Sequence, residues 1–258
     1  MIRIVGPAIA TSIQDQGRYG SRMQGFGRSG AMDTASLRAT NRAAGAAAGA
    51  AGIEFGPGLL VVEITAPGGT IAFGGAFRSG APWWQTIEAE PGDRFELGSP
   101  AEGMWSYLAL GGGVDAPIVM GSRSASVREG IGSWLAPGAV LGAGHDHVEP
   151  QPVVAPPMSG DVRVYGGLSG EFTVGNRVDR MGYQLEGGSV AGGRADLLSE
   201  PLVPGCIQVP PDGRPIVLMA EGPTVGGYTV GGVVHSEDLR LVAQGQPGNR
   251  IRLVAAGS

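Results

Sequence analysis

Residues 206–228, with the sequence CIQVPPDGRPIVLMAEGPTVGGY, decide the fold. Two apolar, partly β-branched runs at 207–209 and 215–219 stand on either side of the Pro-Pro-Asp-Gly sequence at 210–213, which is typical of a tight turn. The pattern predicts two strands joined by that turn. The second strand is apolar throughout, as expected for a strand covered on both faces. A Gly-Gly pair at 226–227 follows, where absent side chains let a ligand or another backbone come close.

Short strands are predicted along the rest of the chain, because apolar runs recur between Gly, Pro and Asp residues. They lie at 2–5, 59–65, 70–73, 94–97 and 104–110. One helix is predicted at 34–41, with Asp33 as its N-cap. Glycines at 45 and 49 each weaken a continuation by about 1 kcal/mol relative to alanine, so we expect 43–52 to be a frayed end and a loop. The chain is therefore predicted to be all-β or nearly so.

The two halves of the chain share one local pattern. A Pro-Gly pair at 91–92 and another at 247–248 each precede an alternating strand, and both predict a type II turn. Between the halves, a stretch rich in Pro, Gly and His indicates a domain boundary. We expect domains at 1–143 and 161–258, with a linker at 144–160.

Two histidines, His145 and His147, flank Asp146 within the predicted linker. A His-Asp-His sequence suggests a metal site, but no third ligand stands at a usable spacing. We interpret the segment as a solvated linker and expect no metal.

Composition excludes several classes of function. The 258 residues are 42% hydrophobic, enough for a core, and the net charge of −5 gives no basic surface for nucleic acid or an anionic membrane. All 18 basic residues other than histidine are arginines, so the chain supplies no lysine for a Schiff base, a general base or a P-loop. Cys206 is the single cysteine, and no apolar run reaches about 18 residues. A cytoplasmic protein is expected.

Several polar or aromatic residues have two interpretations. Arg123, between Ser122 and Ser124, offers bidentate donors to a carboxylate or phosphate, or else forms a structural ion pair. The polar residues of 12–18, which include Gln14, Asp15 and Arg18, are expected to form a solvated turn, and Glu54 a solvated strand edge. The pair Trp83-Trp84 would contact a partner protein or close the end of a core.

Uncommon motifs stand in a fixed order along almost the whole chain. They are SGAMD at 29–33, GSRS at 121–124, DRMGY at 179–183, QVPPDGRPIVLM at 208–219 and T-x-GGY at 224–228. In this set and order the chain resembles the biotin-dependent carboxyltransferase family. That family includes the C subunit of 5-oxoprolinase, proteins named allophanate hydrolase subunit 2, the antagonist of the Kip kinase inhibitor and the carboxyltransferase domain of urea amidolyase.

The resemblance implies a fold and a site. It implies two cyclophilin-like β-barrel domains, with the active cleft between or beside them. In an amide-processing enzyme of this kind, Asp33, Glu221 and Tyr228 would be the catalytic residues: the two carboxylates would orient or deprotonate an amide N–H, and Tyr228 would hydrogen-bond the carbonyl. Asp33 is equally well explained as the helix N-cap. The substrate-binding candidates are Ser29, Met32, Arg123, Arg180, Tyr183, Gln208, Thr224, Gly226 and Gly227, with the arginines holding a carboxylate and Gln208 the carbonyl.

This sequence departs from the family pattern in two places. The family has a G-P-Q motif and an added helix before its S-D-R-M-G-Y run, whereas here residues 162–167 lead almost directly into 174–180. The family loop D-x-Q-T-T-G-G-Y-P-K here reads EGPTVGGYTV at 221–230, so the glutamine, a threonine, the proline and the lysine are replaced. A valine cannot hold or polarise a carboxylate.

Three functions remain open from the sequence. The first is an enzyme component similar to the 5-oxoprolinase C subunit, acting on a small lactam or amide with a partner similar to the 5-oxoprolinase B subunit. The second is a relative without biotin or ATP chemistry, which binds a larger apolar metabolite and catalyses cyclisation, isomerisation or hydrolysis. The third is a non-catalytic regulator that binds a protein. We expect no firmly bound cofactor; biotin, or ATP through the partner, is implied by the resemblance alone.

Overall fold

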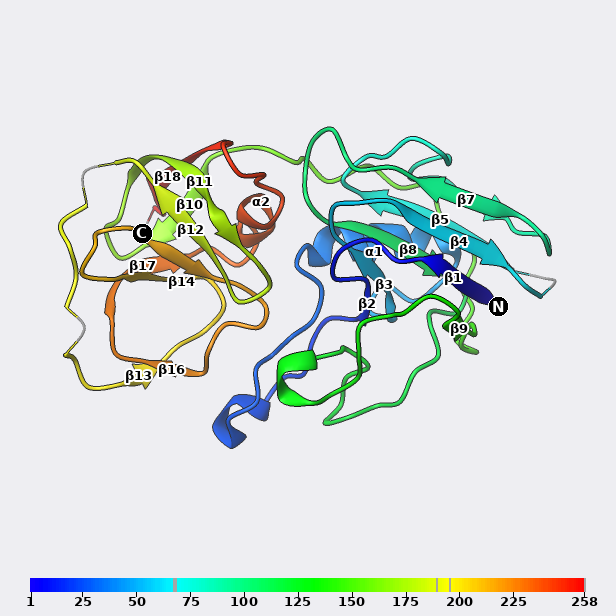
Figure 1. Cartoon of the computed structure of the whole chain (residues 1–258), viewed down its shortest axis with the longest axis horizontal. Helices are drawn as coiled ribbons and strands as arrows, with labels where there is room; N and C mark the ends of the chain where they lie inside the picture. The colour runs from blue at the N-terminus through cyan, green and yellow to red at the C-terminus, as the bar shows by residue number, and fades with distance from the viewer. Residues whose placement is uncertain (67–68, 189, 195, 258) are drawn as a thin grey trace. The chain divides into compact units, whose positions relative to one another are not determined.

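A computed structural model describes residues 1–66, 69–188, 190–194 and 196–257. The chain forms two compact units: unit 1 comprises Met1–Tyr19 and Ser29–Pro156, and unit 2 comprises Gly20–Arg28 and Pro157–Ser258. Strands dominate both units (Figure 1), and the α-helices found in the described ranges are α1 (Thr34–Ala44) and α2 (Leu239–Ala243). The predicted all-β class is confirmed. No helix in the described ranges is long and apolar enough to cross a membrane.

Unit 1 consists of two antiparallel sheets with a common core. One sheet has the order β7 (Arg94–Leu97), β4 (Leu60–Ile64), β1 (Ile2–Gly6), β9 (Val140–Leu141). The other has the order β2 (Ser12–Gln14), β3 (Gly52–Phe55), β8 (Ser106–Leu110), β5 (Thr70–Gly75), β6 (Ile87–Glu88). Buried residues from both sheets, among them Ile4, Val62, Phe55 and Phe73, form one hydrophobic cluster.

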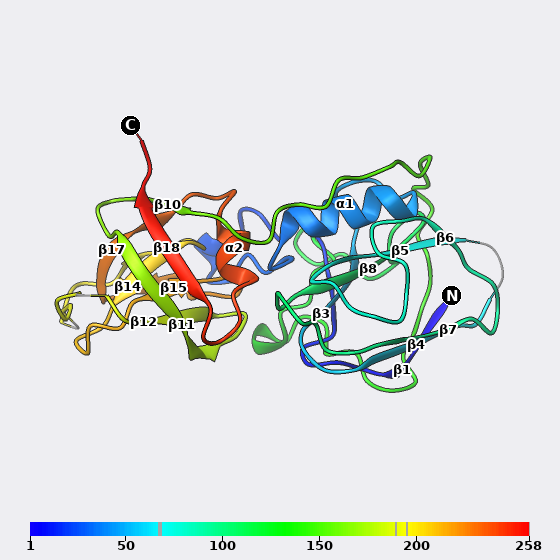
Figure 2. The same ribbon diagram turned by 90° about the horizontal axis from the view of Figure 1, so that it is seen from above.

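Helix α1 lies along β5 and β8 (Figure 2) and ends later than the sequence predicts. Ala43 and Ala44 form its last turn, and both pack against Ala72 and Ala109 of the sheet. Gly45, with φ of 78°, ends the helix. The alanines of the segment expected to fray are thus small residues at a close helix–sheet contact, and this contact stabilises the final turn.

The tryptophan pair lies in the core of unit 1. Trp83 is 7% exposed, its ring stacks on Phe73 with centroids 5.7 Å apart, and its Nε1 donates to the Gly75 carbonyl at 3.1 Å. Trp84 packs against the same cluster. The Trp83-Trp84 pair, which suggested a protein-binding surface in the sequence, is therefore explained by packing in the core.

Unit 2 contains a closed barrel of seven strands. Around the barrel the order is β10 (Val162–Tyr165), β17 (Thr229–Val234), β14 (Cys206–Val209), β15 (Ile216–Leu218), β12 (Gly182–Glu186), β11 (Gly170–Val178), β18 (Arg250–Ala255). The strands predicted in 206–219 are β14 and β15, and the turn between them is closed by the Gly213 N–H, which donates to the Pro210 carbonyl at 3.0 Å. A loop of four residues joins β10 to β11, so the described residues of 157–188 contain no helix, as the sequence predicts.

Two short segments of unit 2 stand apart from the barrel. Strands β13 (Glu200–Pro201) and β16 (Val225–Gly226) pair with each other as a separate two-stranded sheet. The 3-10 helix η1 (Ser21–Gln24) belongs to unit 2, although it precedes α1 in the sequence; a second 3-10 helix, η2 (Val127–Glu129), belongs to unit 1.

Both predicted Pro-Gly turns are present. Gly92 has φ of 95° and Gly248 has φ of 89°. Each turn is closed by a hydrogen bond, from the Asp93 N–H to the Glu90 carbonyl at 3.0 Å and from the Asn249 N–H to the Gln246 carbonyl at 2.9 Å. A positive φ at the third turn residue is the feature of a type II turn that glycine favours.

Part of the predicted linker packs with unit 1. The N–H groups of Val148 and Gln151 donate to the carbonyls of Gly45 and Arg42, both at 3.0 Å, and the units divide after Pro156. His145 and His147 are exposed. In the described part of the chain no three His, Cys, Asp or Glu side chains are grouped to hold a metal ion.

Candidate functional site

Two buried amides lie on the outer face of the unit 2 barrel. Gln184 of β12 and Gln208 of β14 both pair with Ile216 of β15, so the three side chains share one face of the sheet. The adjacent residues Tyr183 and Val217 point to the opposite face and are fully buried, which identifies that face as the barrel interior. Gln184 and Gln208 are nevertheless only 5% and 6% exposed.

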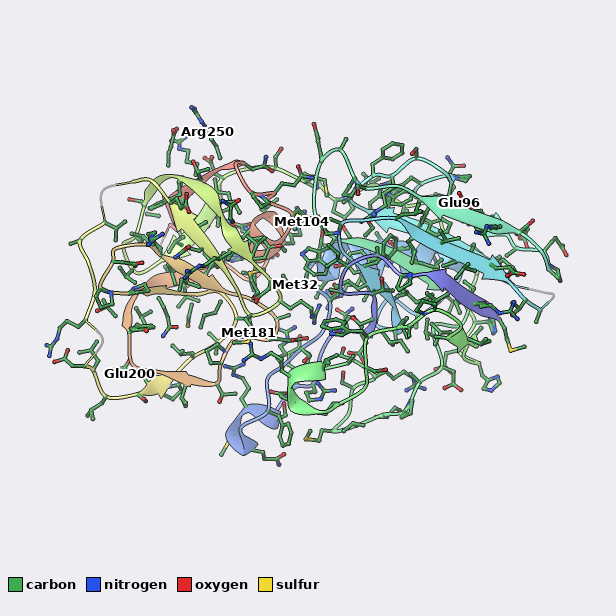
Figure 3. All side chains as sticks on the ribbon, in the orientation of Figure 1. Met32, Glu96, Met104, Met181, Glu200 and Arg250 are labelled. Carbon is green, nitrogen blue, oxygen red and sulfur yellow. The ribbon has the colours of Figure 1, made fainter. Side chains whose placement is uncertain are left out.

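A cavity of about 500 Å³ opens onto this row of residues. Its lining combines the two amides with apolar side chains and a charged rim: Asn176, Arg177, Val178, Asp179, Met181, Gly182, Gln184, Gln208, Ile216, Leu218 and Pro223. Figure 3 labels Met181 of this lining. The charged members, Arg177 and Asp179, are exposed, and Asp179 Oδ1 accepts from the Met181 N–H at 2.7 Å. A buried polar group among apolar walls is the usual composition of a small-molecule site.

The carboxamide of Gln208, a residue that lines this cavity, carries an unused donor. Among the described residues its buried Nε2 has no hydrogen-bond partner. A buried donor left unpaired costs about 1–3 kcal/mol, so such groups are rare unless a ligand or water completes them. Gln208 is the predicted site residue that lines the cavity.

Gly226 of β16 lies directly against the Gln208 amide. A Cβ at this glycine would stand 2.6 Å from Gln208 Nε2 and 2.6 Å from Leu202 Cδ1. Leu202 follows β13 and packs with Cys206 and Leu218 on the outer face of the barrel. The two-stranded sheet therefore covers the end of the row that carries Gln208, and a larger residue at 226 would require the Gln208 or Leu202 side chain to shift.

Arg180 and Glu221 form a buried ion pair. Arg180 Nε lies 2.7 Å from Glu221 Oε1, and the side chains are 4% and 6% exposed. The backbones are joined as well, because the Glu221 N–H donates to the Arg180 carbonyl at 2.7 Å. The structure thus brings together a predicted carboxylate-binding arginine and a predicted catalytic carboxylate, and each neutralises the other.

The other predicted residues of unit 2 serve the fold or lie at its surface. The Tyr183 hydroxyl, inside the barrel, donates to the Ala243 carbonyl of α2 at 2.8 Å. Thr224 accepts the Leu202 N–H at 2.9 Å through its carbonyl, and a Cβ at Gly227 would stand 2.8 Å from the Leu197 carbonyl. Tyr228 is 41% exposed.

Met32 and Asp33 of unit 1 belong to a buried network at the start of α1. The Met32 N–H donates to Glu54 Oε2 at 2.7 Å, and the Tyr107 hydroxyl donates to the same oxygen at 2.8 Å. That hydroxyl also accepts the Asp33 N–H at 2.7 Å. Burial raises the pKa of Tyr107 well above its ordinary value, and the Glu54 carboxylate adds to the effect.

Asp33 is the N-cap of α1, as predicted. Its Oδ1 accepts the Ser36 N–H at 3.0 Å and its Oδ2 accepts the Ser36 hydroxyl at 2.6 Å. Ser29 precedes it with φ of 51° and is 3% exposed. Among the described residues its hydroxyl has no hydrogen-bond partner. The prediction that Glu54 forms a solvated strand edge was wrong, because this carboxylate is fully buried as a hydrogen-bond acceptor.

The solvated turn predicted at 12–18 is also wrong. Gln14 and Arg18 are 0% and 1% exposed. Asp15 binds the loop that contains Arg123: its carboxylate accepts from the Ser122 and Ser124 hydroxyls and from the Arg123 N–H at 2.6–2.7 Å. A motif of polar residues that looked solvated in the sequence is the anchor of a second loop.

Arg123 lines a second cavity, of about 390 Å³, in unit 1. Arg123 Nη2 lies 3.7 Å from Asp115 Oδ1, and Asp15, Asp115 and Asp146 line the same cavity. A cavity with three carboxylates and one guanidinium is a poor site for an anion. The alternative interpretation of Arg123, a structural ion pair, agrees with this geometry.

Sequence reasoning missed most of the cavity in unit 2. Gln184 stands two residues after Gly182 in the DRMGYQ sequence, and its alternation with Tyr183 was the available signal. Arg177, Met181 and Pro223 come from separate parts of the chain, and no spacing in the sequence connects them.

Comparison with known proteins agrees with this fold and these motifs. The family model described as "Carboxyltransferase domain, subdomain A and B" matches residues 24–255. The chain belongs to this carboxyltransferase family. The family resemblance predicted from the ordered motifs is confirmed.

Two relatives in the family are named as the C subunit of 5-oxoprolinase. The protein from Escherichia coli K12 is 33% identical over 278 aligned residues, which cover 96% of this chain and 89% of the relative. The protein from Haemophilus influenzae is 30% identical, covering 99% of this chain and 91% of its own length. Because 278 aligned positions exceed the 258 residues of the chain, the Escherichia coli relative has insertions where this carboxyltransferase-family chain has none.

Solved structures show the same fold. A crystal structure of TTHA0988 has a TM-score of 0.90 and 31% identity, covering 98% of this chain and 56% of TTHA0988, so the chain spans about half its length. The Kluyveromyces lactis urea carboxylase matches with a TM-score of 0.85 over 99% of this chain and 27% of that protein, at 23% identity, and shows the fold alone.

Proposed function

We propose that this chain is the substrate-binding component of an amide-processing enzyme of the 5-oxoprolinase type, and that unit 2 binds the amide or lactam group. The observation that carries the proposal is that Gln208 lines a cavity of about 500 Å³ and that its buried Nε2 has no partner among the described residues. The two relatives named as 5-oxoprolinase C subunits support the class of reaction.

Gln208 would recognise the substrate carbonyl. Its N–H group donates to a carbonyl oxygen within an apolar cavity, where a hydrogen bond is stronger than in water. The same donor stabilises negative charge that develops on that oxygen when the amide carbon is attacked. Gln184, on the far side of Ile216, presents a second carboxamide to the same cavity.

Chemistry that needs a lysine or a nucleotide would belong to a partner protein. The chain contains no lysine, and its buried cation beside the cavity, Arg180, is paired with Glu221. The charged side chains that line the cavity, Arg177 and Asp179, lie at its rim. The residues present therefore do not fit a carboxylated biotin, and we assign no step to biotin or ATP on this chain. We therefore include in the proposal a partner protein, similar to the 5-oxoprolinase B subunit, that supplies this chemistry.

Calorimetric titration of the full chain with 5-oxoproline, 2-pyrrolidinone and urea tests the proposal. We expect binding by the wild type and at least a tenfold weaker Kd in Gln208→Leu, which removes the donor and keeps the size. Gln151→Leu, an exposed glutamine of unit 1, is the matched control and should bind as the wild type does. An unchanged Kd in Gln208→Leu would contradict the role of this residue. Loss of ATP-dependent turnover in Gln208→Leu reconstituted with the partner would extend the result to catalysis.

A second candidate function follows from the apolar lining. Val178, Met181, Ile216, Leu218 and Pro223 surround the amides, and this composition favours an amide that bears a larger apolar group. If this chain is a family member that has lost ATP chemistry, it would bind such a ligand and reject 5-oxoproline and urea. Adding N-benzylpyrrolidinone to the titration series separates the two functions.

A further inference from the structure

Arg22 joins both strands of the small sheet that covers Gln208. Its Nη2 donates to the carbonyl of Leu202, which follows β13, and to the carbonyl of Pro223 at 2.9 Å, which precedes β16. The Leu202 N–H in turn donates to the Thr224 carbonyl at 2.9 Å. One guanidinium thus closes the end of the ribbon made by residues 200–202 and 223–226, which we name the β13–β16 ribbon. Figure 3 labels Glu200, its first residue.

The β13–β16 ribbon is a short two-stranded sheet. Its strands are two residues long, with Glu200 opposite Gly226 and Pro201 opposite Val225. A two-stranded sheet of this length is not stable alone in water. Its contacts with the barrel include those of Leu202 with Cys206 and Leu218, and of Gly226 with Gln208.

Arg22 is also well placed to fix the separation between the Leu202 and Pro223 carbonyls. The 3-10 helix η1 that carries it is bounded by Gly20 and Gly25, whose φ values are 83° and 86°. A guanidinium binds two carbonyls with a planar, pre-organised set of donors. Because Pro223 lines the cavity and Gly226 touches the Gln208 amide, the position of the ribbon sets how open the amide site is.

We propose that Arg22 is a positioning residue of the amide site: it holds the β13–β16 ribbon closed over Gln208. The inference rests on the proposed function for its meaning in catalysis, since it assigns Arg22 to the site that binds the amide. Without Arg22, the carbonyls of Leu202 and Pro223 lose this donor and the ribbon opens more often by local unfolding.

Cys206 supplies a reporter for that opening. It is the chain's single cysteine, it is 5% exposed, and it lies on the same face of β14 as Gln208, in contact with Leu202. The experiment measures the rate at which N-ethylmaleimide modifies Cys206 in the native full chain. We expect the rate in Arg22→Ala to rise at least tenfold, and the rate in Arg22→Lys, which keeps a donor, to lie between those of Arg22→Ala and the wild type.

Arg214→Ala is the matched control. Arg214 also belongs to unit 2, but it is half exposed and bonds to Asp212 in its own turn, so the wild-type rate is expected. A wild-type rate in Arg22→Ala would overturn the proposal. Should Arg22→Ala not fold, Arg22→Gln and Arg22→Lys provide the same comparison.

A second part of the experiment, with an added amide ligand, tests the role of Arg22 separately from the proposed function. We expect 2-pyrrolidinone, at a concentration that saturates the wild type, to slow Cys206 modification, and we expect its Kd to weaken at least fivefold in Arg22→Ala and to recover partly in Arg22→Lys. An unchanged Kd in a variant that labels faster would overturn the positioning role. If the wild type binds no amide at all, the proposed function fails, while the labelling rates still decide whether Arg22 holds the ribbon.

Discussion

The Tyr107 hydroxyl joins the start of α1 to β3, and this makes it a residue on which unit 1 depends. It accepts the Asp33 N–H and donates to Glu54, and both partners are fully buried. Replacing Tyr107 by phenylalanine leaves a buried N–H without its acceptor and removes a donor from the carboxylate. We expect the free energy of unfolding in urea to fall by about 1–3 kcal/mol. Tyr165→Phe, at an exposed tyrosine, should leave it unchanged.

Arg180 and Glu221 lead to a second prediction at the residue scale. Removing one member of a buried ion pair leaves an uncompensated charge and costs about 3–5 kcal/mol. We therefore expect Glu221→Gln to reduce the free energy of unfolding by an amount in this range, and Arg180→Met combined with Glu221→Leu to restore most of it. The measurement is urea unfolding of both variants and the wild type.

The comparison for Glu221 is Glu237, whose pair with Arg163 is 3.1 Å long and largely exposed. Exposed pairs contribute about 0–1 kcal/mol, so Glu237→Gln should be nearly neutral. Equal losses in the two single variants would mean that burial does not decide the strength of the Arg180–Glu221 pair.

At the scale of the element, α2 is fastened to β10 by Asp238. The Asp238 carboxylate accepts from the Arg163 N–H at 2.9 Å and from the Arg163 guanidinium at 2.7 and 2.8 Å. The hydrogen-bonded Arg163 guanidinium holds the pKa of Asp238 below its usual value. A carboxyl whose pKa is lower in the folded state stabilises that state above its unfolded pKa of about 3.9, and this contribution is lost as the pH falls through the folded value.

Asp238→Asn should therefore be less stable than the wild type at pH 7, and the difference should narrow as the pH falls below about 4. Urea unfolding between pH 7 and pH 3 measures both. Asp161→Asn, at an exposed pair with Arg252, is the control and should change stability by about 0–1 kcal/mol at most. A difference between Asp238→Asn and wild type that stays constant with pH would contradict this account.

The elements that could be predicted from the sequence are those that depend on interactions between neighbouring residues. The turns at 91–92 and 247–248, the N-cap at Asp33 and the strands around 210–213 depend on residues within a few positions of one another. Buried polar groups could not be predicted in the same way. In the sequence alone Glu54 resembles a solvated carboxylate, because its hydrogen-bond donor Tyr107 is distant in the sequence and comes close only in the fold. The cavity was found only through Gln208, because its other walls come from separate segments that the barrel assembles.

At the scale of the whole molecule, residues 20–28 are part of unit 2, although the rest of that unit is synthesised much later. The chain leaves unit 1 after Tyr19 and returns to it at Ser29, before α1 begins. During synthesis, which proceeds from the N-terminus at about 5–20 residues per second, this segment emerges well before Leu202 and Pro223 exist. Arg22 therefore has no carbonyl partner in the β13–β16 ribbon until residues 202 and 223 have been synthesised, and the ribbon acquires its clamp only after both strands exist.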